Sequence, residues 1–180
     1  KSGTEVLLSM MYNPLDWGGK PIVKVSHSKL RNLVGSTDMN SKYIRVSFND
    51  FFDENGHYLL AKDVEIAYEK LPKDRNLFDK DIIKVDERVN ICFAIFGSGI
   101  FRLFPLPKDS NNIWLTYTQS TEFSGNDSLF VANIMPMYFK AVEEGITTNN
   151  WITADTIVGY IQRFQRKYGV EILPEKNKIN

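Results

Sequence analysis

An alternation of apolar and polar residues runs from about residue 20 to residue 120 and constrains the possible fold more than any other feature. It is clearest over residues 85–96, where Val89, Ile91 and Phe93 would point one way and the residues between them the other way. A period of two is typical of strands with one buried face. The intervening residues also become apolar toward Phe96, which predicts a central strand covered on both sides.

The last third of the chain has a helical period instead. Ile157, Ile161 and Phe164 recur at helical spacing within residues 153–168. Thr153 can cap the start, and a glycine follows the end. The sequence therefore predicts an amphipathic helix that packs its apolar stripe over the reverse of the sheet, near Cys92 and Ala94.

A shorter helix is predicted just before it, with Pro136 in its first turn and Gly145 at its end. Together these patterns predict a single α+β domain over residues 1–180: an antiparallel sheet from the strand-rich residues 1–120, covered on one face by helices within residues 128–169. Residues 170–173 would add a short last strand.

Within the first part, residues 22–25 predict a strand and residues 28–35 a short helix that is capped by Ser28 and stops at Gly35. Residues 44–48 alternate and are followed by a turn, so we expect a hairpin with residues 57–60. Residues 113–117 predict a further strand.

Residues 61–71 fit two structures. Val64, Tyr68 and Leu71 have helical spacing, whereas Val64, Ile66 and Tyr68 have the spacing of a strand. A helix would expose Ile66 and would place the like charges Glu65 and Glu69 four residues apart. We therefore expect a strand.

The glycine-rich break Gly97-Ser98-Gly99 could hold a phosphate or turn the chain. A P-loop would continue with a lysine and a serine or threonine, and a dinucleotide-binding loop would have glycine where Arg102 stands. Both matches fail, whereas a glycine between two strands suits a three-residue hairpin loop. We expect a turn without affinity for phosphate.

Charge and hydropathy exclude several partners. Twenty-two basic residues balance twenty-two acidic ones, so no net field favours nucleic acid. No apolar run reaches the roughly 18–20 residues of a membrane span. The chain opens on Lys1 rather than methionine, and we expect the mature part of an extracytoplasmic protein, periplasmic or on the cell surface. Cys92, the sole cysteine, is expected to be inert core rather than a nucleophile.

Chemistry-bearing motifs are sparse. His27 and His57 are far apart in the sequence and lack metal-ligand spacing. A calcium-like loop around Gly56 would place Phe51 and Lys62 where calcium needs carboxylates. We expect no metal and no cofactor, and an enzyme only if dispersed Asp, His and Ser side chains form a hydrolase site in a cleft.

Aromatic residues on loops and strand faces are the candidate ligand contacts. Trp17, flanked by Asp16 and Lys20 in a Pro- and Gly-rich stretch, could stack on a ligand or could instead plug the core. Trp114 and Tyr117 could form an exposed strand face. The function predicted is a non-catalytic binding or interaction module for a protein, peptide or glycan ligand, with the hydrolase as the alternative.

The predicted C-terminal helix also carries the basic cluster Arg163, Arg166 and Lys167. Cations near the C-terminus of a helix complement its dipole, and we prefer this explanation over a phosphate-binding face.

Overall fold

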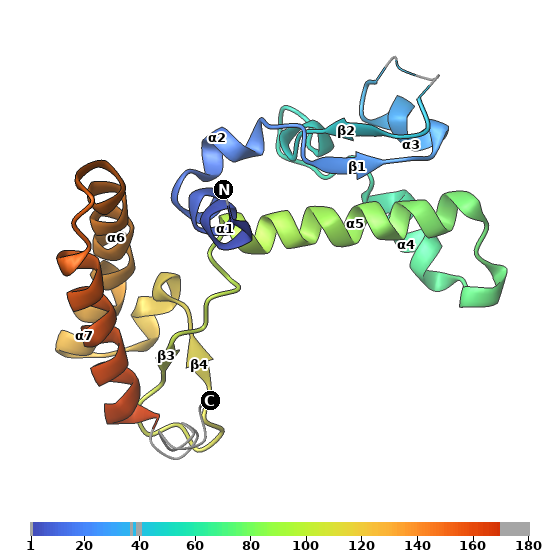
Figure 1. Cartoon of the computed structure of the whole chain (residues 1–180). Helices are drawn as coiled ribbons and strands as arrows, with labels where there is room; N and C mark the ends of the chain where they lie inside the picture. Colours follow the sequence, from blue (N-terminus) through green and yellow to red (C-terminus); the bar gives the residue numbers. More distant parts are fainter. Residues whose placement is uncertain (1, 37, 39–40, 170–180) are drawn as a thin grey trace. The chain divides into compact units, whose positions relative to one another are not determined.

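A computed structural model describes residues 2–36, 38 and 41–169 (Figure 1). The chain forms two compact units, one within residues 1–96 and the other within residues 97–180. Both are mainly helical, and their strands form two small antiparallel pairs. The predicted α+β fold with a large sheet is therefore wrong. The prediction that the chain is a single domain stays a prediction, because it depends on whether the two units unfold together.

Helix α5 (Leu77–Phe96) replaces the strand expected at residues 85–96. Its buried residues Val85, Val89 and Cys92 are spaced by four and three, which is a helical stripe. The alternating residues Ile91 and Phe93 lie outside this stripe and are 58% and 68% exposed. The period of two was therefore produced by apolar residues on the solvent side of a helix.

Helix α4 (Ala61–Glu69) shows that the strand preferred for residues 61–71 is also wrong. Ala67 is buried, whereas Ile66 and Tyr68 are 43% and 47% exposed. The like charges of Glu65 and Glu69 are solvated on the helix surface, where such a pair costs only about 0.2–0.5 kcal/mol. Packing of α4 against α5 outweighs that cost.

The other elements of the first unit are short. They are α1 (Gly3–Tyr12), α2 (Pro14–Gly18), β1 (Val23–Val25), α3 (Ser28–Leu33), β2 (Ile44–Val46) and the 3-10 turns η1 (Asn49–Phe51) and η2 (Pro72–Asp74). The first predicted strand and the short helix α3 are confirmed, but the predicted cap is wrong, because His27 and not Ser28 is the N-cap residue. The expected hairpin is wrong: β2 pairs with β1, and residues 52–58 contribute one isolated bridge.

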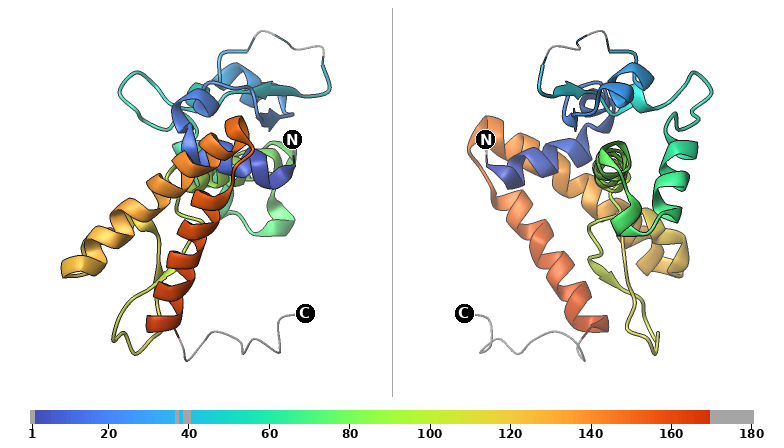
Figure 2. Two further views of the ribbon diagram at one scale, coloured as in Figure 1. Left: turned by 60° about the vertical axis from the view of Figure 1, so that its left-hand side comes forward. Right: turned by 90° about the vertical axis from the view of Figure 1, so that its right-hand side faces the viewer.

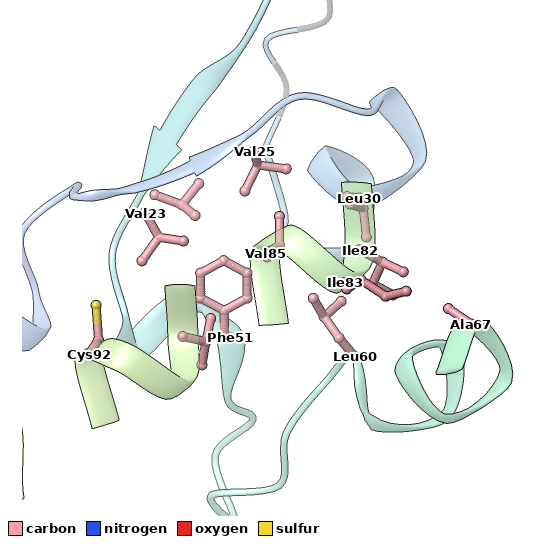
Figure 3. Close-up of a cluster of buried hydrophobic side chains, with 12 residues drawn as sticks. Val23, Val25, Leu30, Phe51, Leu60, Ala67, Ile82, Ile83, Val85 and Cys92 are labelled. Atoms are coloured by element: carbon pink, nitrogen blue, oxygen red, sulfur yellow. The ribbon is translucent and has the colours of Figure 1, made fainter. Parts of the chain in front are cut away.

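The core of the first unit lies between the β1–β2 pair and α5 (Figure 3). Val25, Phe51 and Val85 are fully buried in it. Cys92 is at one end of the same cluster, and burial raises the pKa of its thiol. The expectation that Cys92 belongs to the core is confirmed, although it lies on a helix.

The second unit consists of a strand pair, a 3-10 segment and two long helices. Its elements are β3 (Phe104–Pro105), β4 (Trp114–Leu115), η3 (Tyr117–Glu122), α6 (Gly125–Thr148) and α7 (Ile152–Tyr168). The predicted helix 136–145 is part of the longer α6, so its bounds are wrong. Pro136 lies inside α6 on an exposed position, and Gly145 is buried within the helix instead of ending it.

Helix α7 confirms the predicted C-terminal helix and its end at Gly169. Two details are wrong. Thr153 lies inside the helix and does not cap it. At the start of the helix, the Asn150 side chain accepts a hydrogen bond from the Ile152 amide. Phe164 packs within its own unit, against the rings of Phe104, Phe123, Phe130 and Tyr168, because the described residues form no large sheet for it to cover.

The helices α6 and α7 meet at their connecting turn and diverge away from it in both views of Figure 2. The strand pair β3–β4 packs against α7, with Phe104 opposite Leu115. The predicted strand 113–117 is thus shortened to two residues. The strand predicted at 170–173 lies outside the described residues.

Candidate functional site

Trp17 lies in helix α2 instead of the expected loop. Its ring is half-buried, and its indole N–H donates a hydrogen bond to Ser9 Oγ over 3.0 Å. Lys20 Nζ lies 4.5 Å from the ring centroid and forms an ion pair with Asp16. The structure thus brings the three predicted residues together: Lys20 contacts both the Trp17 ring and the Asp16 carboxylate, while the Trp17 N–H is bonded to Ser9. That they bind a ligand stays a prediction.

Trp114 and Tyr117 have structural contacts in the second unit. A Cβ added to Gly169 would lie 2.9 Å from Trp114 Cζ2, so the half-buried indole closes over the end of α7. The Tyr117 hydroxyl lies 3.1 Å from Ser98 Oγ. The predicted strand face is therefore largely occupied by contacts within the unit, and its binding role stays a prediction.

The Gly97-Ser98-Gly99 segment is a turn, as expected, but it follows helix α5 and does not join two strands. Ser98 has φ of +56° and is buried against Tyr117. A side-chain hydrogen bond thus supports a backbone conformation that few residues other than glycine adopt. The hairpin is wrong, and the lack of phosphate affinity stays a prediction.

The histidines make local contacts. His57 Nδ1 lies 3.1 Å from Asp53 Oδ2, and hydrogen bonds from the His57 and Asn55 backbone help to lower the pKa of that carboxyl group. His27 Nδ1 accepts a hydrogen bond from the Lys29 amide and so caps α3. Across the described residues, no three His, Cys, Asp or Glu side chains gather to hold a metal ion.

An open groove of about 410 Å³ lies between the first turns of α6 and the second half of α7. It is lined by Asn126, Asp127, Phe130, Tyr160, Arg163, Phe164 and Lys167. Phe130 and Phe164 form its floor, with ring centroids 5.1 Å apart and ring planes within 8°. Tyr160, 45% exposed, adds a third ring at the side. We call this feature the α6–α7 groove.

The rim of the α6–α7 groove is charged. Asp127 accepts a hydrogen bond from the Tyr168 hydroxyl and lies 3.8 Å from Lys167 Nζ. Polar contact with Tyr168 and the charge of Asp127 raise the pKa of Lys167, which keeps its ammonium charged. The guanidinium of Arg163 lies 5.5 Å from the Tyr160 ring centroid. The rim therefore combines two cations with one carboxylate.

Local sequence patterns identify only half of the α6–α7 groove. Tyr160, Arg163 and Lys167 have the spacing of one helix face, and that signal was present in the sequence. Dipole complementarity, which we preferred for the basic cluster, applies to the last turn and so covers Arg166 and Lys167 but leaves Arg163 unexplained. The α6 half depends on tertiary packing, for which the sequence has no local signal.

Within the part of the chain that the structure describes, no helix has both the length and the apolar character needed to cross a bilayer.

Comparison with known proteins places the chain beside a much longer one. It matches no known protein-family profile. It is 34% identical over 188 aligned positions to Protein NrfI of Wolinella succinogenes, and the alignment covers 99% of this chain and 19% of that protein. The chain therefore spans about a fifth of the length of the curated relative that it matches.

Proposed function

We propose that this chain is a non-catalytic binding module that holds a protein or peptide ligand in the α6–α7 groove. The observation that carries the proposal is the combination of an aromatic floor with an exposed tyrosine and arginine. Tyrosine and arginine are enriched among the residues that contribute most to protein–protein affinity. Here the Arg163 guanidinium lies over the Tyr160 ring, and both residues line the groove that also contains the stacked rings of Phe130 and Phe164.

The side chains of the α6–α7 groove suit binding better than catalysis. A general base takes a proton from its substrate, whereas each oxygen of the Asp127 carboxylate already contacts a polar group of the protein, the Tyr168 hydroxyl or the Lys167 ammonium. Arginine and charged lysine have no lone pair to offer. The Asp53–His57 pair, the nearest approach to a hydrolase motif, is exposed on a turn of the other unit.

A stretch of Protein NrfI aligns with nearly the whole of this chain. In that relative the stretch is a minor part of a long protein. A binding module fits such a setting, because one part of a long chain can hold a partner while other parts do other work.

The test is panning of a random 12-residue peptide library on the immobilised full chain. The wild type is compared with the double variant Tyr160→Ala/Arg163→Ala, whose circular dichroism and melting temperature should match, because both side chains are exposed. We expect peptides that the wild type retains and the variant does not. Absence of enrichment on the wild type, equal retention by the variant, or cleavage of retained peptides would each contradict the proposal.

A further inference from the structure

We infer that the ligand of the α6–α7 groove is a segment of a partner protein in which an acidic residue adjoins an aromatic or aliphatic one. This inference rests on the proposed function and specifies the chemistry of its ligand. It is carried by the charges and rings of the described residues.

The charge of the α6–α7 groove is complementary to an anion. Asp127 is already neutralised by Lys167 and hydrogen-bonded by Tyr168. Within the described residues, Arg163 forms no ion pair and lies outside the last turn of α7; its guanidinium lies over the Tyr160 ring, a cation–π contact that leaves its charge without a carboxylate partner. One positive charge is in excess, and its five N–H donors suit a carboxylate.

The floor of the groove is complementary to an apolar side chain. The half-buried Phe130 ring and the exposed Tyr160 ring offer aromatic surface to a ligand, and Phe164 packs behind Phe130 with 6% of its side chain exposed. The Arg163 guanidinium is 5.5 Å from the Tyr160 centroid. Side chains close in sequence span about this distance, since neighbouring Cα atoms are about 3.8 Å apart. One short segment can therefore fill both positions.

The openness of the groove favours a segment of a larger molecule over a free small molecule. Pockets for small ligands typically enclose about 70–90% of the ligand surface. An open groove contacts one side of its ligand and leaves the rest in solvent. The α6–α7 groove therefore suits one or two side chains of a longer chain.

The experiment uses the peptides retained in the panning, synthesised in two forms. One keeps each aspartate or glutamate, and the other has asparagine or glutamine in its place. Affinities for the full chain are measured by fluorescence anisotropy. We expect the amide forms to bind about fivefold to tenfold more weakly, because they lose a charge-assisted contact with an exposed arginine.

Two variants separate the Arg163 contact from general charge attraction. Arg163→Gln should abolish the difference between the acidic and amide peptides, whereas Arg166→Gln, an equal change of charge on an exposed residue outside the groove, should preserve it. Acidic and amide peptides of equal affinity would overturn the inference while leaving the proposed function intact. Loss of the difference in both variants would also overturn it.

Sedimentation velocity tests whether a second copy of this chain is the occupant instead. We expect a monomer at the protein concentrations used for binding. A dimer that dissociates in Arg163→Gln but not in Arg166→Gln would overturn the inference, because the groove would then be filled by the chain itself.

Discussion

Replacement of Phe164 by alanine tests whether the second unit has the core described here. The side chain is 6% exposed and contacts four rings, whose centroids lie 4.9–6.0 Å from its own. Truncation of a buried phenylalanine costs about 3–5 kcal/mol. Each aromatic pair adds about 0.5–1.5 kcal/mol beyond area burial, which places the expected loss in the upper half of that range.

The loss can be measured by urea denaturation of the full chain, followed by circular dichroism. Domains have free energies of unfolding of about 5–15 kcal/mol, so the variant should lose a large part of its stability. Phe164→Leu, which keeps most of the apolar volume, should lose clearly less. A loss under about 1 kcal/mol for Phe164→Ala would refute the packing described for α7, because core truncations cost more than that.

Three other perturbations test the first unit. Trp17→Ala should lower the melting temperature by several degrees, because it removes a half-buried ring and its bond to Ser9, and an unchanged transition would show that the ring does not support the fold. Cys92 should react with a disulfide reagent far more slowly in the folded chain than in urea, because burial raises its pKa; equal rates would contradict its position. Asp79 is buried, and a hydrogen bond from Lys70 lowers its pKa from 3.8. Its stabilisation is complete above the unfolded pKa and is lost as pH falls through the lower folded value, so Asp79→Asn should flatten the decline in melting temperature below about pH 4. A decline as steep as that of the wild type would contradict this role.

Local sequence patterns predicted an element correctly where all of them fit the same secondary structure. In α7 the apolar stripe, the polar opposite face and the final glycine all agree, and the predicted helix was confirmed. In α5 two periods coincide, since Val85, Val89 and Cys92 form a helical stripe while Ile91 and Phe93 add a period of two. Only the burial of one set and the exposure of the other decide between them, and burial depends on tertiary packing.

The binding role of the candidate residues stays a prediction, but their exposure was difficult to predict for a related reason. Aromatic residues in Pro- and Gly-rich or strand-like segments suggested ligand contacts at Trp17 and Trp114, with a plug on the core as the alternative for Trp17. Both rings pack within their own unit, one hydrogen-bonded to Ser9 and the other against Gly169. The α6–α7 groove requires that Asp127 and Phe130 meet residues more than thirty positions later in the sequence, and no local period encodes such a meeting.

The residues of the α6–α7 groove have two different roles, stability of the core and binding of the ligand. Phe164 is both floor and core, so its loss weakens stability and binding together. Tyr160 and Arg163 face solvent, so their loss should weaken binding while the melting temperature stays nearly constant, as surface substitutions usually change stability by less than about 0.5 kcal/mol. If Tyr160→Ala instead lowers stability as much as a core truncation, the exposed ring is part of the fold, and the groove loses the residue that distinguishes a binding surface from the edge of a core.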